Sequence, residues 1–202
     1  MSKRFFISLF AIFSAVFAWS VIKPHDYFTW GLEVFPIFIA LPILFFSYKK
    51  FPLTPLLYIL ILLHVTILMI GGHYTYAEVP LFNWLRDTFD LSRNYYDRIG
   101  HFAQGFVPAM IAREILLRKN VLKQSGWLFF IVTCICLSIS ACYEFIEWWV
   151  AVASGTGADA FLGTQGDVWD TQWDMFTALI GAICAQLLLA KLHNQQLSAL
   201  EV

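Results

Sequence analysis

Six long apolar stretches dominate this sequence of 202 residues, and each is long enough to cross a bilayer as a helix. A hydrocarbon core about 30 Å thick needs ~20 predominantly apolar residues per helix. The composition agrees, because 59% of the residues are hydrophobic and 13% are charged, about half the ~25% charged residues of a soluble domain. We therefore predict an all-α fold: a single integral membrane domain over residues 1–202, built as a polytopic bundle of six transmembrane helices. The expected spans are approximately residues 5–22, 30–48, 53–72, 99–117, 127–151 and 173–191.

The charge and the cysteines exclude several other classes of protein. Lys and Arg total 13 and Asp and Glu total 14, and this balance argues against nucleic-acid binding through a basic face. Aromatic residues make up 18% of the chain, which excludes an intrinsically disordered protein. The four cysteines lie inside apolar runs and form no C-x-x-C pair, so we expect neither a disulfide nor a thiolate metal site.

The basic residues predict the orientation of the bundle. With a cytoplasmic N-terminus, nine of the 13 Lys and Arg residues fall on the cytoplasmic side, as the positive-inside rule requires. An even number of spans returns the C-terminus to the same side, so we predict an N-in, C-in topology. The segment Met1–Ile22 also has the features of a secretory signal, with Lys3 and Arg4 ahead of an apolar stretch. We favour an uncleaved first helix because further spans follow closely, and cleavage is the alternative.

The acidic residues have the opposite bias, since all except Glu114 and Glu201 lie on the outer side or in the outer ends of spans. Between the third and fourth spans, residues 80–91 mix aromatic and leucine side chains with charged ones. This pattern predicts a short amphipathic helix in the membrane interface. Residues 152–172 contain four glycines and no Lys or Arg, which predicts a flexible external loop.

Three polar clusters fall near the outer ends of the last three spans. They are Asp97 with His101, Glu144 with Glu147, and Asp167 with Asp170 and Asp174. Within each cluster, neighbouring residues are three or four positions apart, so they share a helix face. For the third cluster this holds only if the last helix begins early enough to include Asp167. The fourth and sixth spans run inward and the fifth runs outward, so all three clusters are expected at one depth. Ionisable groups inside membrane helices are costly and indicate function.

This combination of carboxylates and one imidazole predicts a divalent metal site. Carboxylates so close together cannot all stay ionised without a cation or a shared proton. Oxygen ligands with one nitrogen suit Mg²⁺, Mn²⁺, Ca²⁺ or Zn²⁺, and the residue types leave the identity of the ion open. The predicted metal ligands are Asp97, His101, Glu144, Glu147, Asp167, Asp170 and Asp174, with His101 or Glu147 as the general base.

A purely structural interpretation of the same residues stays open. Asp167 or Asp170 can cap the last helix and favour its dipole. Asp97 can pair with Arg93 or Arg98. Glu144 and Glu147 fit this interpretation poorly, because negative charge is disfavoured at the C-terminal end of a helix.

Other polar residues give weaker signals. His64 lies in the middle of an apolar run, and we expect it to be packed and hydrogen-bonded. We expect His25 and His193 to be solvated. Glu33, near the outer end of the second span, can line the predicted pocket, but nothing in its spacing requires this.

Three classes of function fit these features. The first is a divalent-metal-dependent enzyme or ligand-binding site for a lipid or lipid-linked envelope substrate, in which Arg93 or Arg98 neutralises an anionic headgroup. The second is a cation or proton transporter or channel, since acids inside a bundle also form proton relays. Against it, Glu114 is the single acid expected in the inner half of the bundle. The third is a non-catalytic membrane scaffold. The expected surroundings are the lipid bilayer, with no nucleic-acid partner.

The motifs resemble those of one family of bacterial membrane proteins. Residues 96–105 read Tyr-Asp-Arg-x-Gly-His-Phe-x-Gln-Gly, residues 144–148 read Glu-Phe-x-Glu-Trp, and residues 166–175 read Gly-Asp-x-Trp-Asp-Thr-Gln-x-Asp-Met. Across the whole chain this resembles the YjdF-like family of inner membrane proteins, which has no established activity. The resemblance implies an inner-membrane location and importance for the seven acidic and histidine residues named above.

A looser similarity, covering only the last three spans, is to VanZ-like membrane proteins, which are linked to glycopeptide-antibiotic tolerance. Asp97, Arg98 and His101 resemble their first motif, although Lys is usual where Arg98 stands. A later Glu and an Asp-x-x-Asp-x-x-x-Asn motif complete the pattern, and here Asp174 stands where Asn is usual. The similarity implies a shared site and leaves the substrate open.

Overall fold

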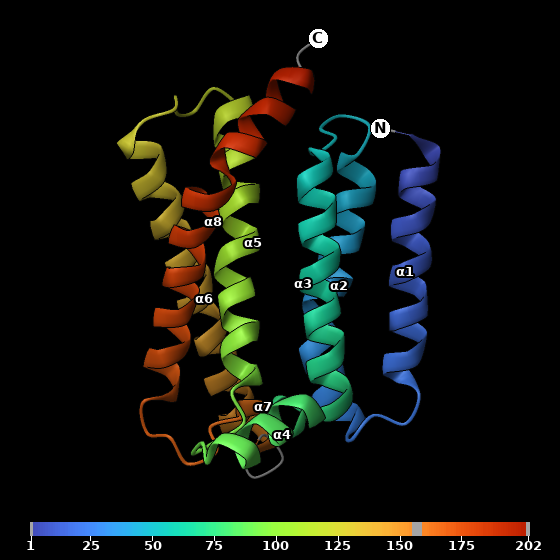
Figure 1. The fold of residues 1–202 in the computed structure, drawn as a ribbon, viewed down its shortest axis with the longest axis vertical. Helices are drawn as coiled ribbons and strands as arrows, with labels where there is room; N and C mark the ends of the chain where they lie inside the picture. The colour runs from blue at the N-terminus through green and yellow to red at the C-terminus, as the bar shows by residue number, and fades with distance from the viewer. Residues whose placement is uncertain (1, 155–158, 201–202) are drawn as a thin grey trace.

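The computed structural model describes residues 2–154 and 159–200, and each regular element in this part of the chain is a helix (Figure 1). The all-α fold class is confirmed, and each of the six predicted spans is helical. The long helices are α1 Lys3–Val21, α2 Tyr27–Ser47, α3 Pro55–Tyr74, α5 Tyr96–Arg118, α6 Gly126–Ser154 and α8 Asp170–Leu200. The short ones are η1 Tyr76–Glu78, α4 Pro80–Phe89 and α7 Asp159–Leu162.

Five of the long helices in the described part of the chain, all except α5, are apolar enough to cross a membrane by length and composition. The helix α5 has sufficient length, 23 residues, but it carries buried charged residues along much of it. It packs against α3, α6 and α8 in the middle of the bundle (Figure 1). Its polar groups therefore face protein and not lipid, which is where a membrane bundle tolerates them. A membrane helical bundle follows from this arrangement, while the number of six crossings stays a prediction.

Both termini lie at the same end of the bundle, and α4 and α7 lie across the opposite end (Figure 1). We call these the N/C end and the far end. Termini on one side agree with an even number of crossings. The side of the membrane that each end faces stays a prediction, in which the N/C end is cytoplasmic.

The two connections at the far end differ in part from their predicted forms. The predicted helix over residues 80–91 is α4, which ends at Phe89 because Asp90 adopts the left-handed conformation, with φ of 50°. Its location in the membrane interface stays a prediction. The prediction of a loop over residues 152–172 is wrong at both ends, since residues 152–154 continue α6 and Asp170 begins α8. Within it, α7 places Phe161 in the interior, with 4% of the residue exposed, and residues 155–158 lie outside the described residues.

Two glycines bring α5 and α8 into backbone contact. A Cβ atom on Gly105 would overlap the carbonyl group of Ala178, and a Cβ atom on Gly181 would overlap the carbonyl oxygen of Phe102. Small residues at helix crossings allow such close approach inside membranes. Because the two axes lie so close here, the charged residues one or two turns away at the far end also meet across the same pair of helices.

A buried polar network joins α3, α5 and α8 at the N/C end. Glu114 accepts hydrogen bonds from the Thr54 amide (3.1 Å) and hydroxyl (2.8 Å), Arg118 (2.7 Å) and His193 (2.9 Å). Both Glu114 and His193 are 0% exposed, so the expectation that His193 is solvated is wrong. Arg113 donates to Nδ1 of His193 at 2.7 Å, and an arginine only donates. The imidazole is therefore neutral, with its proton on Nε2, and it lies between a cation and an anion.

The glycine contacts generate a test of the α5–α8 packing. We expect Gly105→Ala and Gly181→Ala each to destabilise the protein by about 1–3 kcal/mol, because the added methyl group forces the two backbones apart. Thermal unfolding of the full-length protein in detergent measures this. The control is Gly31→Ala in α2, where an added Cβ atom meets nothing within 4 Å. Destabilisation by Gly31→Ala equal to that of the other two variants would contradict the proposed packing.

Candidate functional site

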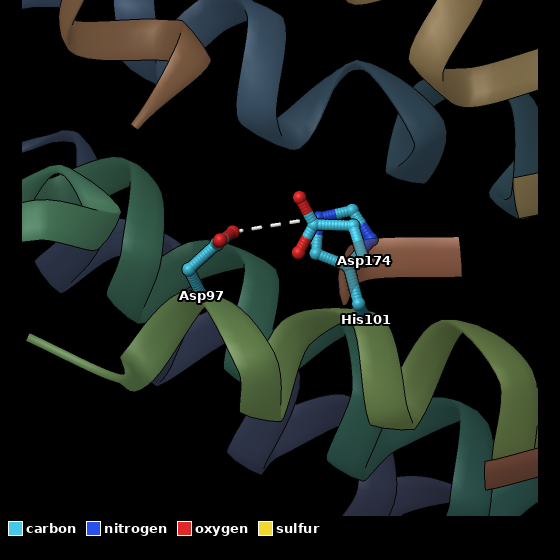
Figure 2. Close-up of side chains that lie close together, drawn as sticks. All are labelled: Asp97, His101 and Asp174. Carbon is cyan, nitrogen blue, oxygen red and sulfur yellow. Dashed lines mark ion pairs between the residues drawn. The ribbon is translucent and has the colours of Figure 1, made fainter. Parts of the chain in front are cut away.

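The predicted polar clusters of α5, α6 and α8 meet at the far end of the bundle. Figure 2 shows Asp97 and His101 on α5 beside Asp174 of α8. His101 Nε2 lies 3.4 Å from an Asp97 oxygen and 3.5 Å from an Asp174 oxygen. On its other side, His101 Nδ1 lies 3.9 Å from Glu144 Oε1 of α6. The imidazole of His101 is thus the group around which the three clusters gather.

Two arginines neutralise much of the aspartate charge, and we call these pairs the arginine–aspartate network. Its members are Arg93, Arg98, Asp97, Asp167, Asp170 and Asp174. Arg93 bridges Asp170 (2.5 Å) and Asp97 (3.3 Å). Arg98 bridges Asp97 (2.9 Å), Asp170 (2.7 Å) and Asp174. Asp97 therefore forms ion pairs with both Arg93 and Arg98, as the purely structural interpretation of these residues expected.

The network also fixes the segment before α8. Arg93 donates to the carbonyl oxygens of Gly163 (3.0 Å) and Thr164 (3.2 Å). Asp167 precedes α8, so the predicted helical stripe of three aspartates shortens to Asp170 and Asp174. Asp167 accepts a hydrogen bond from the Trp169 amide (2.9 Å) and lies 3.6 Å from Arg93, with 28% of its side chain exposed. It therefore lies at the edge of the site.

Within the described residues, Glu144 and Glu147 of this site have no arginine partner, and we call His101, Glu144 and Glu147 the histidine–glutamate group. One ligand atom from each of the three lies within 4.8 Å of the others, as does one from each of Asp97, His101 and Asp174. Glu144 Oε1 is buried and accepts no hydrogen bond within the described residues. A buried carboxylate oxygen without a partner is costly, so this atom is suited to a bound cation or a proton.

The hydrogen bonding of His101 points to the same requirement. Its Nδ1 lies 3.2 Å from Gln104 Oε1, and this contact is a hydrogen bond when Nδ1 carries the proton. The neutral ring then presents the lone pair of Nε2 to the carboxylates of Asp97 and Asp174. A lone pair facing two carboxylates is repulsive unless a proton or a metal ion lies between them.

A cavity of about 220 Å³ adjoins this group. Glu33, which the sequence allowed as a lining residue, lines this cavity. His64, Tyr76 and Tyr143 also line it and were not predicted as site residues. Glu33 could be noticed in the sequence because it is an acidic residue within the apolar run of α2. No motif or residue spacing pointed to the two tyrosines. His64 has no hydrogen bond in the described part of the chain, so the expectation that it is hydrogen-bonded is wrong.

The cavity is covered at the far end of the bundle. The ring of Tyr76 packs so closely on α3 and α5 that a Cβ atom on Gly71 or Gly100 would overlap it. The short helix α7 packs against α2, α6 and η1, and its Phe161 lines the cavity. Towards the middle of the bundle, the cavity wall includes Pro36 and Pro108.

Comparison with known proteins places this chain in a family. A family model described as "Predicted membrane protein (DUF2238)" matches residues 5–195. The chain belongs to this family. It is 53% identical over 176 residues to "Inner membrane protein YjdF" of Escherichia coli (strain K12), and the alignment covers 87% of this chain and 84% of that protein. No solved structure matches at a significant level.

These findings confirm the predicted resemblance to YjdF-like proteins and the assignment to the membrane. The similarity to VanZ-like proteins stays a prediction from the motifs. The DUF2238 match includes most of each of the six long helices, and the arginine–aspartate network and the histidine–glutamate group both lie within the matched region.

The arginine–aspartate network of this DUF2238 protein can be tested by removing one cation. Arg93→Gln leaves Asp97 and Asp170 buried with less compensation, and we expect a loss of about 3–5 kcal/mol in stability. Thermal unfolding in detergent measures the loss. The control is Arg86→Gln, because Arg86 pairs with Asp87 on the exposed surface of α4, where ion pairs contribute little. Equal unfolding midpoints for the two variants would show that the buried pairs do not stabilise the fold.

Proposed function

We propose that this protein is a multi-pass inner membrane protein whose histidine–glutamate group binds a divalent cation and acts with it on a lipid or lipid-linked envelope substrate. The excess of acid over base at the far end carries the proposal. Two arginines face seven carboxylates there: Glu33, Asp97, Glu144, Glu147, Asp167, Asp170 and Asp174. Two positive charges cannot balance seven negative ones in a low-dielectric interior, so a further cation or several protons are required.

The three residues of the histidine–glutamate group are the proposed ligands. Glu144 contributes the unpartnered Oε1 atom, and His101 contributes a ring nitrogen. Asp97 and Asp174 offer a second ligand set with His101. Arg93 and Arg98 pair with all four aspartates. Asp167 and Asp170 belong to neither ligand set, so their proposed role is to hold the two arginines in place.

The chemistry of the site suits hydrolysis or the binding of a phosphate group. A bound divalent ion supplies a Lewis acid and lowers the pKa of a coordinated water. Glu147 lines the cavity and is the proposed general base when the ion is held by the second ligand set, Asp97, His101 and Asp174. The arginines are already paired with aspartates, so an anionic group of the substrate is balanced by the cation and not by Arg93 or Arg98.

The surroundings of the cavity favour a substrate from the membrane. The cavity lies among helices of the membrane bundle, and apolar Pro36, Leu68 and Ile139 line it together with the polar groups. The relative from Escherichia coli carries the name of an inner membrane protein, which supports the same location for this chain. A ligand with a polar head and an apolar body matches such a lining.

Transport of a cation or proton is the alternative, and the N/C end of the bundle does not favour it. Glu114 is enclosed by Thr54, Arg118 and His193, so its carboxylate is fully engaged. A non-catalytic scaffold is the remaining alternative, and the unpartnered Glu144 oxygen gives no support to it.

The proposed metal site predicts binding that depends on two glutamates. Purified full-length protein, freed of metal by a chelator, is dialysed against Mn²⁺, Zn²⁺, Mg²⁺ or Ca²⁺, and bound metal is measured by mass spectrometry. We expect about one ion per chain, and at least about ten-fold weaker binding in Glu144→Gln and Glu147→Gln. The matched control is Glu78→Gln, an exposed glutamate at the same end. The metal site is wrong if no ion binds, or if all three variants bind equally.

The catalytic part of the proposal predicts a metal-dependent lipid product. The protein is reconstituted into vesicles that contain phospholipids and polyprenyl phosphates, and the lipids are analysed by mass spectrometry with and without the bound ion. We expect a product that needs the ion and is lost in Glu147→Gln, while Glu78→Gln retains it. If the protein moves cations across the vesicle membrane and forms no lipid product, the result would favour transport instead.

A further inference from the structure

A second, apolar hollow of about 490 Å³ lies beside the site cavity, and we call it the apolar groove. Both α2 and α5 pack on α3, which forms the floor of the groove between them. Its lining is almost entirely hydrocarbon and includes Ala40, Ile43, Leu44, Ile61, Val107 and Ile111. In a membrane bundle such a hollow loses dispersion contacts unless an apolar chain fills it.

The length of the groove matches one leaflet. Its lining runs along α2 from Pro36 to Ser47, and along α5 and its C-cap from Val107 to Lys119. At ~1.5 Å per residue these segments rise roughly 16–18 Å, about half of a hydrocarbon core ~30 Å thick. One end meets the site cavity at His64, near the middle of α3, and the other reaches the N/C end.

The mouth of the groove at the N/C end is basic. Lys119 lines it, together with Phe51. The guanidinium of Arg118 stacks 3.8 Å from the centre of the Phe51 ring, and the ammonium of Lys119 lies 5.3 Å from it. Lys49 and Lys50 directly precede Phe51 and are exposed. Arg118 is balanced by Glu114, so three lysines remain to attract an anion.

The opposite end of the groove has the opposite character. Where the groove meets the site cavity, the polar neighbours include Glu33, Glu147 and Asp97. An anionic headgroup at that end would face carboxylates, whereas at the N/C end it faces lysines. The charges therefore orient a bound lipid with its headgroup at the N/C end and its chain towards His64.

We propose that the apolar groove binds one acyl chain of an anionic phospholipid from the leaflet at the N/C end, with the lipid phosphate beside Lys119, Lys49 and Lys50. This site is separate from the proposed metal site and does not depend on it. Juxtamembrane lysines attract anionic lipids, and the chain fills a groove that the protein side chains leave open between α2 and α5.

Photocrosslinking of defined lipids tests the proposal. Full-length protein is placed in vesicles that contain phosphatidylglycerol with a diazirine on one acyl chain, or phosphatidylcholine with the same chain, in the presence of a chelator. Adducts are counted by intact mass and located by peptide mass spectrometry. We expect adducts concentrated on the groove faces of α2 and α5, and more adduct with phosphatidylglycerol. Equal adduct from both lipids, or adducts spread evenly over all lipid-facing helices, would overturn the proposal.

Two matched pairs of variants sharpen the result. Ala40→Phe fills the groove and is expected to reduce the groove adduct at least ten-fold, while Leu41→Phe, on an exposed part of α2, leaves it unchanged. Lys119→Gln is expected to weaken phosphatidylglycerol labelling about five-fold, while Lys123→Gln at the same end leaves it unchanged. Lys119 is exposed, so this variant decides the outcome even if Ala40→Phe fails to fold. Undiminished labelling in a folded Lys119→Gln protein would overturn the proposal.

Discussion

The pairing of Arg93 and Arg98 with the aspartates is the interaction on which the far end of this protein depends. Ions buried together are stable only when opposite charges and hydrogen bonds compensate them, and here each arginine contacts three or four carboxylates. The guanidinium of Arg93 also donates hydrogen bonds to the carbonyl oxygens of Gly163 and Thr164. The pairing thus joins α5, the start of α8 and the connection before it into one unit. In the described part of the chain, Glu144 and Glu147 lie beside this unit without an arginine partner.

The two ends of the bundle differ in how completely their charges are satisfied. At the N/C end, Glu114 has a partner on each side, and His193 completes a chain from Arg113. At the far end, Glu144 Oε1 accepts no hydrogen bond in the described part of the chain. Fully bonded networks fix a structure, whereas a buried carboxylate oxygen that accepts no hydrogen bond is suited to a proton or a cation. This contrast separates a structural network from a candidate site in a protein whose family name describes only the membrane.

Sequence patterns predicted the long helices and the meeting of the three clusters, because apolar length and helical spacing are local properties. The parts they missed depend on contacts between distant segments. His193 looks solvated at the end of its span, but α8 continues to Leu200 and buries it against α5. Tyr76 enters the cavity wall because Gly71 and Gly100 leave room for its ring. Asp167 misses the expected stripe because α8 begins at Asp170, three residues later, and Asp167 lies in the connection before it.

Tyr76 and Phe161 cover the far end of the cavity, which bears on how a ligand would reach it. Both residues are buried, at 6% and 4% exposure, and they form part of the cavity wall at the far end. Pro36, His64 and Pro108 line both the cavity and the apolar groove. A molecule that arrives sideways through the bilayer is confined to two dimensions. Its supply is set by its mole fraction among the lipids, so diluting the surrounding water leaves the occupancy of the cavity unchanged, and diluting the membrane lowers it.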